Sequence, residues 1–371
     1  MNIARNLSKR AIIALLTTLI VSQASGLSLE EDGLEKIMKR LKTPTTLSTQ
    51  TTGHSADGNL EFSYQVGGNA KTVTLLDPLP VRTLENGEEI ELQLYQAEVD
   101  GHPAILAMED DTLMLNRRDV VEDRLVHYQV DFNESEASEQ LLQANPSTRN
   151  AHRKYPIDVE LKTPDALINQ RKITTSSPHQ QDKTIRLFVF KHQDVRDSIG
   201  TVTHNLFSWW VREMHHINQR HMNRGGASLF PDITIDFRSA PDIQSFNYGG
   251  DPVQKLMIFA SKVQNYQDKH ELHGTFSRYK FILITRHWLD WKTLGIAYEG
   301  GQYGMASSGN HQVAGHELGH MFNGRHEYAD ILYNGWWCET AIFPEALPLR
   351  SNCFRHTDKN RDVIADYLNE W

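Results

Sequence analysis

The sequence lacks an apolar run long enough to cross a bilayer. Residues 11–21 are apolar, but they fall short of the ~20 residues that a spanning helix needs. A basic segment, residues 1–10, precedes this run, and the small residues Ser22 and Ala24 follow it. This order is typical of a secretory signal peptide. We therefore predict a signal peptide over residues 1–26, no membrane span, and a secreted or periplasmic protein.

The chain also has no excess of positive charge. It carries 38 Lys and Arg against 47 Asp and Glu, a formal net charge of -9. A protein that binds nucleic acid needs a basic face for the phosphates. The composition therefore argues against a nucleic-acid partner, and it gives no indication of the oligomeric state.

Cysteine is almost absent, with Cys338 and Cys353 as the two examples in 371 residues. In an exported chain two cysteines this close together favour a disulfide, which would contribute ~3 kcal/mol by closing a short loop. The alternative, Cys338 as a metal ligand or a free nucleophile, has no supporting spacing.

The segment from 311 to 326 is rich in chemically active side chains. His316 and His320 are four residues apart, so on a helix they share one face and can bind a single zinc ion. Glu317 lies beside the first of them and can accept a proton from water at the metal. This is the H-E-x-x-H pattern of metallopeptidases.

His326 strengthens this interpretation as a third ligand. It follows His320 by six residues, so it can reach the same metal if the helix stops and the chain turns back. Asn323 and Gly324 stand where that turn is needed, and both residue types enter the left-handed region at little cost. Three neutral imidazoles with one open position are typical of a catalytic zinc site.

Together, His316, Glu317, His320 and His326 resemble the extended H-E-x-x-H-x-x-G-x-x-H signature of the metzincins, above all their reprolysin or ADAM-like bacterial secreted members. The resemblance implies a zinc-dependent endopeptidase. Two departures stand out: Asn323 replaces a glycine, and no methionine follows Met321, although metzincins place one in a turn beneath the zinc. Another residue between 341 and 354 must take that place, with Leu347 and Leu349 as candidates.

Residues 184–371 alternate strand and helix patterns. We predict strands over 185–190, 233–237 and 281–285, and helices over 202–222, from Asp251 onward, and over 357–371. This order predicts an α/β (α+β) catalytic domain with a twisted mixed sheet and an active-site helix, similar to that of the metzincins. The substrate-binding candidates, which resemble the metzincin edge strand, are Gly295, Ile296, Ala297 and Tyr298. A plain exposed hairpin is the alternative for this stretch.

The N-terminal half is polar and strand-like. Strand patterns cover 73–76, 89–99 and 103–107, with turns at Asn86-Gly87 and Asp100-Gly101. Residues 27–160 resemble the β-rich pro-domains of reprolysin-like proteins, and the polar stretch 161–183 is typical of an exposed linker. The chain is therefore expected to be a zymogen, in which no pro-domain cysteine can cap the zinc because none precedes Cys338.

The expected function is hydrolysis of peptide bonds in a protein or peptide substrate, with zinc as cofactor and Glu317 as general base. One alternative is a gluzincin-type peptidase with Glu339 as third ligand. Another is a toxin-like zinc subunit that acts mainly through a partner protein. The sequence does not define the substrate. Three further histidines, His215, His216 and His221, are either a second metal site or ordinary helix residues.

Overall fold

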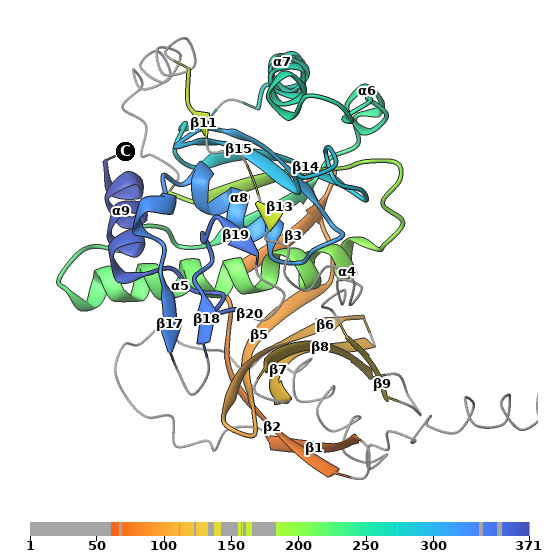
Figure 1. Ribbon diagram of the computed structural model, residues 1–371, viewed down its shortest axis with the longest axis vertical. Helices are drawn as coiled ribbons and strands as arrows, with labels where there is room; N and C mark the ends of the chain where they lie inside the picture. Colours follow the sequence, from red (N-terminus) through yellow and green to blue (C-terminus); the bar gives the residue numbers. More distant parts are fainter. Residues whose placement is uncertain are drawn as a thin grey trace, which may run out of the picture.

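The computed structural model describes residues 61–66, 69–110, 112–121, 124–132, 137–141, 155–156, 158, 161–164, 183–272, 274–333, 337–346 and 351–370. The predicted signal peptide, Leu347 and Leu349 lie outside these residues, as does most of the predicted linker. The chain has a mixed α/β fold, as the sequence predicts at that level (Figure 1). The assignment to the metzincins stays a prediction.

Most strands of the N-terminal half form one antiparallel sheet of seven strands, here called the N-terminal sheet. Alternate residues of its strands form a separate core on one face, which includes Tyr64, Leu106 and Phe132. The predicted turns are confirmed, since Asn86 and Asp100 both have positive φ between paired strands. In sheet order the strands are β1 (Glu61–Val66), β2 (Asn69–Pro78), β5 (Leu92–Val99), β6 (His102–Glu109), β7 (Thr112–Val121), β8 (Arg124–Phe132) and β9 (Ala137–Leu141).

A second sheet of eight strands, here called the central sheet, carries the predicted strands of the C-terminal half. Its middle strands are parallel, whereas β15 runs antiparallel to β16. Both ends of this sheet come from earlier in the chain, since β11 pairs with β15 and β3 pairs with β13. The order is β11 (Leu161–Lys162), β15 (Gly295–Glu299), β16 (Tyr303–Ser307), β14 (Tyr279–Thr285), β12 (Ile185–Lys191), β13 (Ile233–Phe237), β3 (Val81–Glu85) and β4 (Glu88–Glu89).

Helices cover both faces of the central sheet (Figure 1). On one face lie α6 (Pro241–Gln244) and α7 (Pro252–His270), and Asp251 caps α7 as its sequence predicts. The other face carries α8 (Val313–Met321) and the long α5 (Ser208–Asn223), with α9 (Asp358–Asn369) packed beside them. The helix expected over 202–222 begins earlier and contains a π-helical turn, as α4 (Ile199–Val202) and η2 (Thr203–Phe207) precede α5.

Short strands complete the C-terminal part around the predicted disulfide, which the structure confirms between Cys338 and Cys353. This bond links β18 (Trp337–Glu339) to the chain just after β20 (Ser351–Asn352), and β17 (Ile331–Tyr333) pairs with β18. Within the described part of the chain, no helix is both long and apolar enough to cross a membrane.

Candidate metal centre and active site

Helix α8 carries the H-E-x-x-H residues and lies in the interior. It packs against β15 and β16, and its residues His316, Glu317 and His320 are at most 1% exposed. The helix ends at Met321 with Phe322 as its C-cap, and Asn323 then adopts a φ of 70°, as the predicted turn requires. The N–H of Gly324 donates to the carbonyl of Gly319 at 2.8 Å, which closes the turn and sends the chain back toward the helix.

The turn brings three imidazoles to one point. The Nε2 atom of His320 lies 3.2 Å from that of His316 and 3.0 Å from that of His326. The remaining pair, His316 and His326, is 3.2 Å apart. The three histidines of the predicted site therefore meet in space.

The Nδ1 contacts of the two helical histidines, His316 and His320, determine their tautomers. The Nδ1 atom of His316 lies 3.1 Å from the carbonyl oxygen of Ala341, and that of His320 lies 3.0 Å from the carbonyl oxygen of Gly324. A carbonyl accepts only, so each Nδ1 donates and each Nε2 keeps its lone pair directed at the shared point. Burial also lowers the pKa of His316 to about 4, which keeps this ring neutral.

Asp158 completes the cluster from the N-terminal side. Its Oδ2 lies 2.8 Å from His320 Nε2 and 3.4 Å from His316 Nε2, and its Oδ1 lies 3.2 Å from His326 Nε2. Burial would raise the pKa of this carboxyl, but the three imidazoles beside it, His316 above all, hold the pKa well below its usual range. The carboxylate is therefore ionised at the point where the three Nε2 atoms meet.

These four side chains fit a metal ion. Their ligand atoms all lie within 4.8 Å of one another, and a tetrahedral zinc ion would separate its ligands by roughly 3.3 Å. Three lone pairs and a carboxylate that converge in a buried site repel one another unless a cation sits between them. Asp158, His316, His320 and His326 could therefore hold a metal ion.

Glu317 lies in the interior beside this cluster. Burial and the charge of Asp158 raise its pKa well above the usual value, and neither of its oxygens has a hydrogen-bond partner among the described residues. Its carboxyl group packs against Gly295 of β15, where a Cβ atom would lie 2.3 Å from Oε1. A buried carboxyl with a raised pKa is suited to taking up and returning a proton.

The chain that carries Asp158 pairs with other strands on both sides of this residue. We call its described residues, 155, 156, 158 and 161–164, the crossing segment. Ahead of Asp158, β10 (Tyr155–Pro156) pairs with β19 (Glu345–Ala346); behind it, β11 pairs with β15 in the parallel direction. The hydroxyl of Thr163 also donates to the carbonyl of Glu299 at 2.5 Å. Asp158 is thus held between two pairs of strands.

Three positions that sequence reasoning missed shape the site. Asn360 of α9 accepts a hydrogen bond from the N–H of Arg325 and donates to its carbonyl, which fixes the chain next to His326. Ile342 is fully buried, and its Cδ1 lies 3.1 Å from where a Cβ of Gly319 would be. Within the described part of the 341–354 stretch, Ile342 packs against α8 and the turn that follows it. Asp158 is the third, and no local pattern marks it.

The other predicted residues lie as follows. Gly295, Ile296, Ala297 and Tyr298 form most of β15, and their side chains are buried, so only the backbone of this strand can pair with a peptide. Glu339 lies on β18 and is not among the ligand atoms that meet at the histidines. Among the described residues, no second group of three or more His, Cys, Asp or Glu side chains brings its ligand atoms together as this one does. This includes His215, His216 and His221 of α5.

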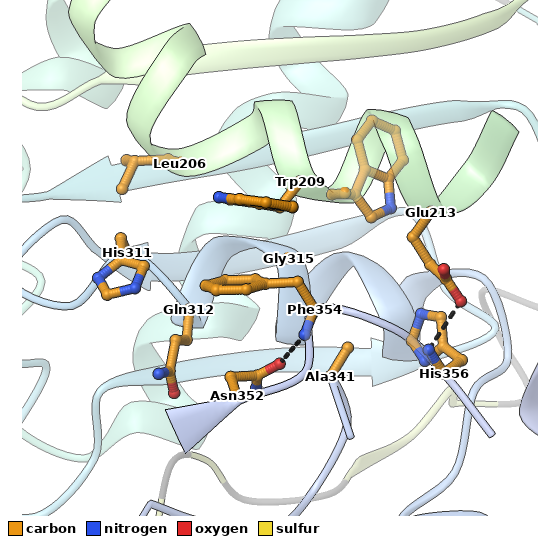
Figure 2. Close-up of a pocket in the computed structure, with 11 residues that line it drawn as sticks. Leu206, Trp209, Glu213, His311, Gln312, Gly315, Ala341, Asn352, Phe354 and His356 are labelled. Atoms are coloured by element: carbon orange, nitrogen blue, oxygen red, sulfur yellow. Dashed lines mark hydrogen bonds between the residues drawn. The ribbon is translucent and has the colours of Figure 1, made fainter. Parts of the chain in front are cut away.

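A small pocket lies behind α8, between this helix and α5 (Figure 2). The Glu213 carboxylate accepts hydrogen bonds from the N–H of His356 at 2.7 Å and from Arg361 at 2.7 Å. Burial raises the pKa of Glu213, but Arg361 outweighs this effect and lowers it. These contacts fix the position of His356, whose ring lies against Gly319 of α8. Also lining the pocket are Leu206, Trp209, Trp210, His311, Gln312, Gly315, Ala341, Asn352 and Phe354.

Comparison with known proteins adds no assignment, because the chain matches no protein-family profile and no curated protein sequence.

Proposed function

We propose that the chain is the latent form of an exported zinc-dependent endopeptidase. The observation that carries this proposal is the buried group of His316, His320 and His326 around one point, with Glu317 beside it on the same helix. Their spacing and tautomers suit zinc, and a buried glutamate with a raised pKa suits proton transfer. The disulfide supports an oxidising compartment, in agreement with export.

In this proposal each group of the site has a separate role in the reaction. Zinc, when bound, supplies Lewis acidity, which polarises the scissile carbonyl and makes water acidic near neutral pH. Glu317 accepts a proton from the attacking water and later gives it to the leaving amine. The carbonyls of Ala341 and Gly324 keep the two helical imidazoles oriented. The backbone of β15 offers hydrogen bonds to an extended peptide.

Latency is the part of the proposal that rests on Asp158. Its carboxylate takes the fourth position around the imidazoles, which water and the scissile carbonyl need in a catalytic site. The crossing segment also pairs with the end of β15, where a peptide would add as a strand. Asp158 therefore acts in place of the missing pro-domain cysteine, and the enzyme is expected to be inactive until this segment leaves.

The experiment is to replace Asp158 by alanine and measure hydrolysis of a peptide library by mass spectrometry. If the closed state holds ~99% of the molecules, Asp158→Ala should raise hydrolysis on the order of 100-fold. Lys162→Ala, an exposed position on the crossing segment, is the matched control and should leave the protein latent. The added substitution Glu317→Gln should abolish the released activity while zinc stays bound. An Asp158→Ala protein that contains zinc but cleaves no peptide would contradict the proposal.

A second candidate function follows from the closed ligand set. Four protein ligands fill a tetrahedral site, as in structural zinc sites, and this would suit a toxin-like zinc subunit that acts through a partner. In that case Asp158→Ala should lower zinc content and thermal stability and release no hydrolysis. The same variant therefore separates the two candidates.

A further inference from the structure

The sequence favours a removable pro-domain, but the contacts between the two halves of the chain indicate a different role. Strand β3 of the N-terminal half extends the central sheet by pairing in parallel with β13 over five residue pairs. All five residues of β13 are buried. If β3 left, this strand would become an open, largely apolar sheet edge, which proteins otherwise cover or shorten.

Polar contacts fix the register of β3 on β13. Arg82 donates to Asp232 Oδ2 from Nε at 3.1 Å and from Nη2 at 2.9 Å. At the turn that follows, the N–H of Gly87 donates to Asp236 and the side chain of Asn86 accepts from the N–H of Ser239. Hydrogen bonds at both ends of the strand make this pairing specific.

The two halves also share one core. The second face of the N-terminal sheet packs on η2 and α5. In Figure 1 the N-terminal sheet lies below the central sheet, with α5 between the two. Six buried apolar residues of the N-terminal half belong to the same cluster as Phe207, Trp210 and Ile235 of the catalytic half. The six are Leu79, Leu92, Leu94, Ile105, Ala107 and Met114.

Buried polar groups join the halves at the π-helical turn. The side chain of Asn116 donates to the carbonyl of His204 at 2.9 Å, and the ring of His204 lies 3.4 Å from the carbonyl oxygen of Ile105. Nearby, Arg118 donates to the carbonyl of Cys353 at 3.1 Å, and its guanidinium lies 4.7 Å from the centre of the Trp209 ring. The side chains of Asn116, His204 and Arg118 would lose these contacts if the halves separated.

We propose that the N-terminal sheet, with β3 and β4, stays bound to the catalytic half as a permanent part of the folded protein. Cutting the chain between residues 164 and 183 then gives two fragments that stay bound to each other. The catalytic half depends on the N-terminal fragment for its folded structure. Only the crossing segment has to leave the metal site. This inference goes beyond the proposed function, because it rests on the interface alone.

The test is to introduce a site for a sequence-specific protease between residues 169 and 178 of the full chain, cut it, and analyse the product by size-exclusion chromatography. Both fragments should elute together at the volume of the intact protein. Elution of the N-terminal fragment by itself, with a folded and monodisperse C-terminal fragment, would overturn the proposal. Neither outcome depends on peptidase activity, so this test and that of the proposed function fail separately.

A variant pair and a denaturant series sharpen this result. Leu94→Asp places a charge in the shared core, so its cut form should separate or aggregate, whereas the exposed neighbour Gln93→Asp should behave as the parent. Where Leu94→Asp does not fold, the cut parent in rising urea gives the answer. The fragments should separate only at urea concentrations at which the helical circular dichroism signal is lost. Separation while that signal is unchanged would refute the inference.

Discussion

Gly295 gives a quantitative test of how closely Glu317, the proposed catalytic base, must be placed. A Cβ at this position would lie 2.3 Å from Glu317 Oε1 and 2.6 Å from Val313 Cγ1, where ordinary contacts are roughly 3.5 Å. The carboxyl of Glu317 must therefore move by about 1 Å in Gly295→Ala. A displacement of this size can reduce turnover by on the order of 100-fold.

The matched control is Gly304 on β16, which pairs with Ala297 of β15 and also faces α8. There a Cβ would meet the flexible end of Met321, with Sδ at 2.9 Å, and no catalytic group. Both alanine variants should lose about 1–3 kcal/mol of stability through overpacking. In the Asp158→Ala background, kcat for a cleaved peptide should fall for Gly295→Ala alone, with zinc content unchanged. Equal turnover in the two variants would refute the reasoning.

The remaining predictions concern metal binding and acid stability. His326→Ala should lose most of the zinc measured after dialysis, whereas Glu339→Ala should keep it; the reverse would support the gluzincin alternative. Burial lowers the pKa of His204 to about 4, so below pH 6.5 the unfolded chain takes up a proton that the folded chain does not. This should cost about 3 kcal/mol of stability as the pH falls from 6.5 to about 4. In urea unfolding, His204→Gln should lose less free energy of unfolding between pH 7 and pH 4.5 than the parent protein does. An equal loss in the two proteins would contradict the assignment to His204.

The helical part of the candidate site could be predicted because its information is local. The spacing of His316 and His320 places them on one helix face, and the residue types at Asn323 and Gly324 predict the turn that brings His326 back. The disulfide could be predicted because the chain offers a single pairing. In each case neighbouring residues determine the geometry.

Asp158 and β3 could not be predicted for the opposite reason. Asp158 meets histidines that are far away in the sequence, and nothing distinguishes it locally from the other acidic residues of the N-terminal half. Strand β3 looks like any short strand, and its pairing with β13 depends on the whole topology. Likewise, the packing of Ile342 beneath α8 depends on how the segment after His326 returns, which residue periodicity does not encode.

The order of the central sheet has a practical consequence for producing the protein. Residues upstream of 165 supply the strands at both of its ends, β11 on one side and β3 with β4 on the other. In a fragment that starts at residue 183, β13 and β15 would both have an unpaired edge while the fragment folds. We expect that fragment to accumulate in inclusion bodies, and supplying residues 61–164 in trans during refolding to restore soluble material.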